Sequence, residues 1–128
     1  MSPTAPGPRT RRVVFWCYTA LLMIATHIPN SAMPQVNIRW FDKAEHLGAY
    51  GLWTLLLFLS GYLKDGPFRA RAARAMGWSA LIAVTDELLQ MIPVLNRVAD
   101  PLDIAADLLG SGCAVCAVWV WERWRKSG

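Results

Sequence analysis

Charged and polar side chains recur at helical spacing inside three of the four apolar segments of this chain. Nine residues form the candidate pocket: Asp42, Lys43, His46, Tyr50, Glu87, Gln90, Arg97, Asp103 and Asp107. Ionisable groups within apolar helices are costly unless they face a polar interior, so such a set is a candidate functional site. A purely structural network of hydrogen bonds and ion pairs between helices is the competing interpretation.

Three kinds of chemistry fit these residue types. His46 and Glu87 could act as general acid and base, the carboxylates could hold a divalent cation, or Lys43, His46 and Arg97 could bind an anionic headgroup. No nucleophile stands out and no ligand spacing is diagnostic of a metal site. We therefore assign no catalytic residue, and we expect neither a metal nor a cofactor.

Helical periodicity groups these residues into faces. The expected face of the second segment carries Asp42, Glu45, His46, Ala49 and Tyr50. In the third it carries Gly77, Ala80, Val84, Glu87 and Gln90, and in the fourth Asp103, Asp107, Gly110 and Ala114. Asp86 lies about 100° around the helix from Glu87, so we expect it to point to a headgroup or to water.

The elements that position these faces are apolar enough for a membrane. The chain has 128 residues, of which 55% are hydrophobic and 17% are charged, which is too apolar for an ordinary soluble domain. Its apolar segments cover residues 13–28, 44–62, 76–92 and 104–121, each near the length that spans a bilayer as a helix. We predict an all-α integral membrane bundle of four transmembrane helices in one domain, residues 13–124, after a disordered tail of residues 1–12.

Basic residues predict the orientation of this bundle. Ten of the thirteen Lys and Arg residues precede the first segment, lie between the second and third, or follow the fourth. The positive-inside rule then places both termini in the cytoplasm and the polar residues at the outer face. The first segment also resembles a signal peptide with a weak cleavage site near Ala32, but Asn30 spoils that pattern, so we expect it to be retained. The net charge of +4 is spread over short segments, and we expect no nucleic-acid partner.

Three polar elements follow one another along the chain: Asp42-Lys43 with His46 and Tyr50, Asp86-Glu87 with Gln90 and Pro93, and Arg97 with Asp103, Asp107 and Gly110. On these elements, residues 38–115 resemble the VanZ-like family of small bacterial membrane proteins. Two features depart from the family. Leu89 stands where members often have His, and Val94, Leu95 and Asn96 lengthen the turn after Pro93.

The resemblance implies a multi-pass protein of the bacterial inner membrane with a role in the cell envelope. The family's namesake is linked to teicoplanin resistance, so we expect an effect on susceptibility to glycopeptide antibiotics. Expected partners are membrane lipid and a lipid-linked or anionic envelope ligand. A small membrane enzyme acting on a lipid-linked substrate and a structural or accessory subunit remain the alternatives.

Overall fold

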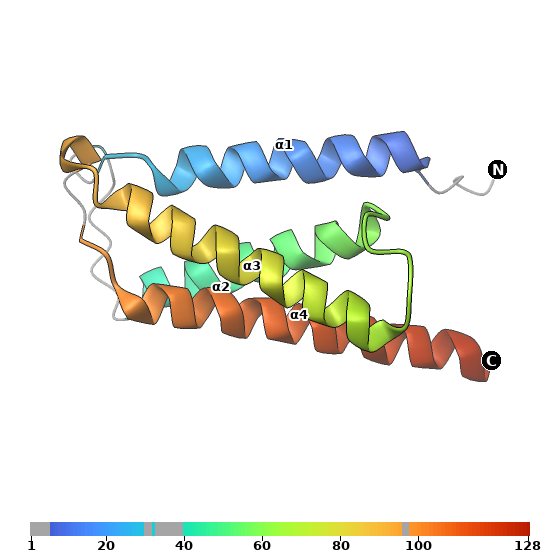
Figure 1. Ribbon diagram of the computed structural model, residues 1–128. Helices are drawn as coiled ribbons and strands as arrows, with labels where there is room; N and C mark the ends of the chain where they lie inside the picture. Colours follow the sequence, from blue (N-terminus) through green and yellow to red (C-terminus); the bar gives the residue numbers. More distant parts are fainter. Residues whose placement is uncertain (1–5, 30–31, 33–39, 96–97) are drawn as a thin grey trace.

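The structure is a computed structural model of the chain that describes residues 6–29, 32, 40–95 and 98–128. These residues form four α-helices, one short 3-10 helix and no strand. The elements are α1 (Pro8–Thr26), α2 (Phe41–Leu59), α3 (Phe68–Gln90), η2 (Pro93–Leu95) and α4 (Pro101–Ser127). Figure 1 shows the α-helices running lengthwise beside one another, with the start of α1 and the end of α4 at the same end of the bundle. The all-helical prediction is therefore confirmed.

Prolines and one carboxylate determine where two of the helices begin. Pro8 and Pro101 each occupy the first turn of a helix, where a missing N–H has no consequence and a fixed φ favours helix. Asp100 precedes α4 and its side chain accepts a hydrogen bond from the Leu102 N–H. The prediction of a disordered tail through residue 12 is wrong for residues 8–12, because α1 starts at Pro8 and includes them.

Helices α2 and α4 approach each other most closely at two glycines. A Cβ atom on Gly51 would lie 3.1 Å from the Gly110 carbonyl oxygen, and one on Gly110 would lie 2.8 Å from the Leu47 carbonyl carbon. No side chain fits at Gly110 unless the backbones move apart. The small residue predicted on this face of α4 therefore serves close helix packing.

A trio of hydroxyl groups joins the middles of three helices. Thr54 of α2 hydrogen-bonds Ser79 of α3 at 2.8 Å and donates to Ser111 of α4 at 2.9 Å. All three side chains are fully buried. Hydrogen bonds of this kind fix which helix faces meet without requiring large apolar side chains between them.

The interior face of α3 matches the predicted one at Glu87 and Gln90 but differs from it nearer the start of the helix. Its buried residues are Ala75, Ser79, Ala83, Asp86, Glu87 and Gln90. Val84, predicted to face inward, is 42% exposed, and Gly77 is also exposed. Small residues lie on more than one face of this helix, so the sequence alone favoured a stripe that is rotated from the actual one.

Helix α1 lies against α2 through polar contacts and aromatic rings. The Trp53 indole N–H donates to the Thr19 hydroxyl at 3.0 Å, and the Tyr18 hydroxyl donates to the Ala49 carbonyl at 3.0 Å. Phe15 packs with its ring centroid 5.4 Å from that of Trp53. The end of the bundle that carries Phe15 and Trp53 holds most of the apolar core. The polar side chains gather toward the other end.

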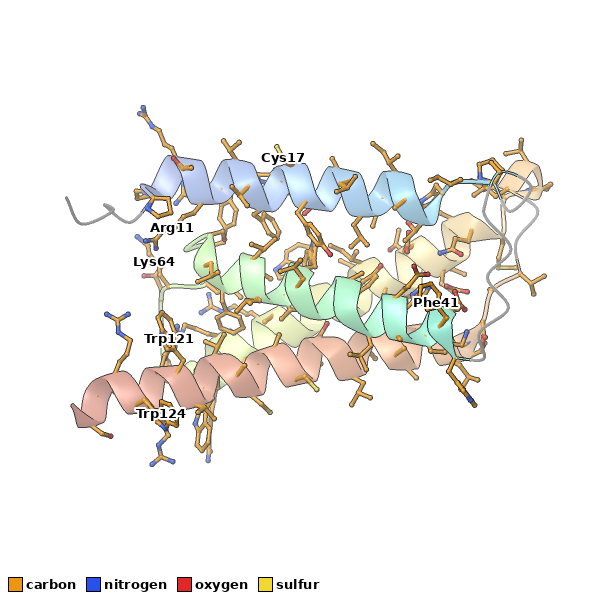
Figure 2. All side chains as sticks on the ribbon, turned by 180° about the vertical axis from the view of Figure 1, so that it is seen from behind. Arg11, Cys17, Phe41, Lys64, Trp121 and Trp124 are labelled. Carbon is orange, nitrogen blue, oxygen red and sulfur yellow. The ribbon has the colours of Figure 1, made fainter. Side chains whose placement is uncertain are left out.

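Many large apolar side chains lie on the surface, and many polar ones lie inside. Among the described residues, twenty-seven large apolar residues are exposed, whereas nine polar or charged residues are buried beside ten apolar ones. Figure 2 shows side chains projecting outward along the whole length of the helices. Among the described helices, α4 alone is long and apolar enough by length and composition to cross a membrane.

Candidate functional site

Lys43 lies in the first turn of α2 and is surrounded by carboxylates. Its ammonium group donates to Asp42 at 3.0 Å, to Asp100 at 2.6 Å and to Asp103. The hydrogen bond from Lys43, and a second from the Leu102 N–H, hold the pKa of Asp100 below its ordinary value. Lys43 therefore serves as a counter-ion that joins α2 to the start of α4.

His46 lies one turn further along α2 and contacts two carboxylates of α4. Its Nδ1 is 2.9 Å from an oxygen of Asp107, and its Nε2 is 4.0 Å from Oδ2 of Asp103. Asp107 is 1% exposed and the His46 side chain is 10% exposed. An imidazole held by a buried carboxylate in this way has a fixed ring orientation.

Asp86 of α3 is as enclosed as Asp107, at 1% exposure. The Thr26 hydroxyl donates to its Oδ1 at 2.7 Å and the Tyr50 hydroxyl donates to its Oδ2 at 3.2 Å. Nδ1 of His27 lies 3.5 Å from the same carboxylate. The prediction that Asp86 points to a headgroup or to water is wrong, because donors from α1 and α2 draw it into the bundle.

Glu87 connects α3 to the start of α4. Its carboxylate is 4% exposed and accepts a hydrogen bond from the backbone N–H of Asp100. Gln90, one turn later on α3, is also buried and its side-chain amide lies 3.5 Å from Asp86. Glu87 and Lys43 thus both contact Asp100. The two acids of α3, Asp86 and Glu87, point to neighbouring parts of the polar region.

The structure places eight of the nine candidate residues in two neighbouring sets of polar contacts, one around Lys43 and His46 and one around Asp86. Those eight are Asp42, Lys43, His46, Tyr50, Glu87, Gln90, Asp103 and Asp107. The ninth, Arg97, lies outside the described residues. The same is true of Asn96, one of the residues by which this turn departs from the family pattern.

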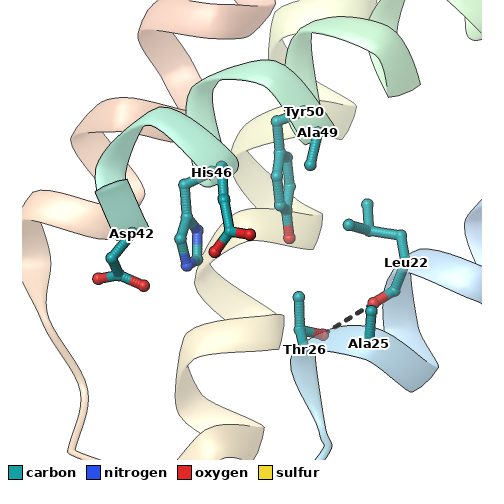
Figure 3. A pocket seen from close by; sticks show the side chains of 8 residues that line it. Leu22, Ala25, Thr26, Asp42, His46, Ala49 and Tyr50 are labelled. Carbon is teal, nitrogen blue, oxygen red and sulfur yellow. Dashed lines mark hydrogen bonds between the residues drawn. The ribbon is translucent and has the colours of Figure 1, made fainter. Parts of the chain in front are cut away.

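A cavity of about 230 Å³ opens beside this cluster, between α1 and α2. Its walls are Leu22, Ala25, Thr26, Asp42, Glu45, His46, Ala49 and Tyr50. In Figure 3 the residues of α2 lie on one side and those of α1 on the other, with the Tyr50 ring between His46 and the α1 residues. One half of the wall is apolar and the other carries two exposed carboxylates.

The sequence missed three residues that contribute to this arrangement. Thr26 and His27 come from the end of α1, which carries no acid, and α1 was not expected to wall the pocket. Asp100 precedes α4, pairs with Lys43 and caps that helix. A polar Thr-His pair at the end of an apolar segment was the available signal for the first two.

Comparison with protein-family models, with curated proteins and with solved structures finds no match to this chain. The resemblance to the VanZ-like family stays a prediction that rests on the residues quoted above.

Proposed function

We propose that this chain is a multi-pass protein of the bacterial inner membrane, of the VanZ-like type, whose outward-facing polar pocket binds a lipid-linked envelope ligand. Through that ligand it lowers susceptibility to glycopeptide antibiotics such as teicoplanin. The observation that carries the proposal is the gathering of seven of the nine Asp and Glu residues at one end of an otherwise apolar-surfaced bundle.

The surface supports a membrane location for all four helices. Contiguous apolar surface on a soluble monomer is rarely larger than a few hundred Å², and here exposed Leu, Val, Ile or Trp residues occur on every helix, for example Leu21, Leu52, Leu81 and Leu109. Among the described residues, the interior holds nine polar or charged side chains beside ten apolar ones. An apolar surface around a partly polar interior is expected where lipid replaces water around the bundle.

Charged residues near the helix ends explain why α1 and α2 look less apolar than α4. Arg9, Arg11 and Arg12 fall in the first turns of α1, and Asp42, Lys43 and Glu45 fall in those of α2. Residues at these depths can reach the interface while the rest of the helix stays in hydrocarbon. The basic turns then lie at the cytoplasmic end and the acidic cluster at the outer end.

The pocket favours a neutral or cationic polar group over a free anion. Lys43 is already paired with three carboxylates, and the cavity wall adds that of Glu45. The apolar half of the wall, Leu22, Ala25 and Ala49, suits the acyl or prenyl part of a lipid-linked molecule. A hydroxyl-rich head on a lipid tail meets both requirements.

An enzyme acting on such a lipid-linked substrate is the second candidate. The observation that favours it is the His46–Asp107 pair beside the cavity, which resembles the base and orienting carboxylate of acid–base catalysts. In that case His46 would exchange a proton with the ligand head.

The proposal is tested in a glycopeptide-susceptible host that expresses the chain. We expect Glu87→Gln and Asp103→Asn to accumulate in the membrane at parental levels and to lose the teicoplanin protection that the parent confers. The charge itself is required in a binding site, whereas the amide preserves shape and much of the hydrogen bonding.

Asp65→Asn is the matched control, because Asp65 is exposed at the opposite end of the bundle. It should protect like the parent. If the parent gives no protection, or if both pocket variants protect fully at equal abundance, the proposed role is wrong.

A further inference from the structure

Three side chains at the outer end of α2 and α4 converge on a common point. Asp42, His46 and Asp103 each offer one potential ligand atom, and these atoms all lie within 4.8 Å of one another. They come from two helices, so no spacing along the chain could have shown them together.

The His46 ring supplies an independent indication of a ligand. Its side chain is 10% exposed and its Nδ1 is engaged by Asp107 at 2.9 Å. Its Nε2 faces the Asp103 carboxylate across 4.0 Å, which is too long for a hydrogen bond, and it makes no hydrogen bond within the described part of the chain. This nitrogen thus lies opposite the Asp103 carboxylate at ion-pair distance, with no hydrogen bond to complete the contact.

We propose that Asp42, His46 and Asp103 bind one divalent transition-metal ion. Metal–nitrogen and metal–oxygen bonds of about 2.0–2.2 Å place two ligand atoms of the same ion about 3–4 Å apart, so the gap between His46 and Asp103 closes with a small inward shift. Metal-binding His residues usually donate their other N–H to a carboxylate, and Asp107 occupies that place.

Lys43 leaves room for the ion. It binds Oδ1 of Asp103 and Oδ2 of Asp42, so the other oxygen of each carboxylate is available. The cluster has an excess of negative charge, since its carboxylates belong to Asp42, Asp100, Asp103 and Asp107, and Lys43 is the one Lys or Arg side chain that the described residues bring into it. A divalent cation would offset that excess.

The ligand set indicates the class of metal and its use. One imidazole with two carboxylates suits Zn²⁺ or Mn²⁺, whereas Mg²⁺ and Ca²⁺ prefer oxygen alone. Three protein ligands leave a position open, and Asp42 and His46 also line the cavity. The inference deepens the proposed function, because it assumes that the pocket takes a ligand, and the ion would offer that ligand a Lewis-acidic contact.

The test measures metal directly and uses no resistance phenotype. The full chain is purified in detergent with Cys17, Cys113 and Cys116 replaced by Ala, since these exposed thiols could bind Zn²⁺ on their own. After removal of metal with a chelator, we expect equilibrium dialysis to show one equivalent of Zn²⁺ per chain. Asp103→Asn and His46→Gln should abolish it, and Asp107→Asn should weaken it about 10- to 100-fold.

Glu45→Gln is the matched control, because Glu45 lines the same cavity but is not one of the three ligands. It should keep the full equivalent. Lys43→Gln should bind Zn²⁺ more tightly than the parent, because a competing cation has been removed.

A second measurement covers the case in which ligand variants fail to fold. Mn²⁺-loaded parent protein should show coupling to one imidazole nitrogen by pulsed electron paramagnetic resonance, and His27→Gln should leave that coupling intact. No stoichiometric Zn²⁺, binding that survives both ligand substitutions, or Mn²⁺ without imidazole coupling would each overturn the inference. The antibiotic and topology experiments would stand unaffected by that failure.

Discussion

Asp86 shows how a carboxylate can stay inside a bundle whose surface is apolar. It is 1% exposed and receives hydrogen bonds from the hydroxyl groups of Thr26 and Tyr50. An ionised group without such partners would be expensive in this environment. The pairing also attaches α1 to α3, because Thr26 lies at the end of the first helix and Asp86 near the end of the third.

Replacing Thr26 by Val should therefore destabilise the protein. The side chain keeps its shape but loses the donor to a buried acceptor, which costs about 1–3 kcal/mol. We expect a lower midpoint of thermal unfolding in detergent. Thr85→Val is the matched control, since Thr85 is exposed and donates within its own helix to the Leu81 carbonyl. Equal shifts for the two variants would show that the Thr26–Asp86 contact adds nothing to stability.

At the scale of helices, the close approach of α2 and α4 positions the Lys43 and His46 clusters. Both clusters consist of an α2 side chain with carboxylates from the start of α4. Gly110 lies one turn after Asp107, and it lets the two backbones approach where a Cβ would overlap Leu47. The helix packing and the polar contacts thus depend on the same pair of faces.

Gly110→Ala should separate these two helices. Overpacking of a tight contact costs about 1–3 kcal/mol, and we expect that loss in an unfolding titration with a denaturing detergent. Gly112→Ala is on the same helix with no atom within 4 Å of the added Cβ, so improved helix propensity should leave its stability equal to or above that of the parent. If Gly110→Ala leaves the stability of the protein unchanged, the α2–α4 contact is looser than described.

Sequence periodicity predicted the helices better than their mutual rotation. Long apolar segments predict helices because length and hydropathy are local properties, and all four helices were found. The stripe on α3 was misplaced at Val84, since Ala and Gly on several faces gave no unique choice. Pairs such as His46 with Asp107 depend on how far one helix is shifted along another, which periodicity within a single helix does not encode.

At the scale of the whole molecule, acid and base are separated along the bundle. Figure 2 shows Arg11 and Lys64 at the end that carries Trp121 and Trp124, with Phe41 at the other end. The carboxylates of the candidate site lie at the Phe41 end. If the basic end lies in the cytoplasm, as the positive-inside rule predicts, the cavity lies on the outer side, within reach of envelope molecules.

The location of the two ends relative to the membrane is the central claim, and cysteine labelling in intact cells tests it most directly. In the background without native cysteines, Val98→Cys lies at the acidic end, where Val98 is 89% exposed, and Asp65→Cys lies in the exposed turn at the basic end. An impermeant thiol reagent should label position 98 in intact cells and position 65 only after the membrane is opened. Labelling of position 65 but not 98 would reverse the orientation, and equal labelling of both positions in intact cells would contradict a membrane-spanning bundle.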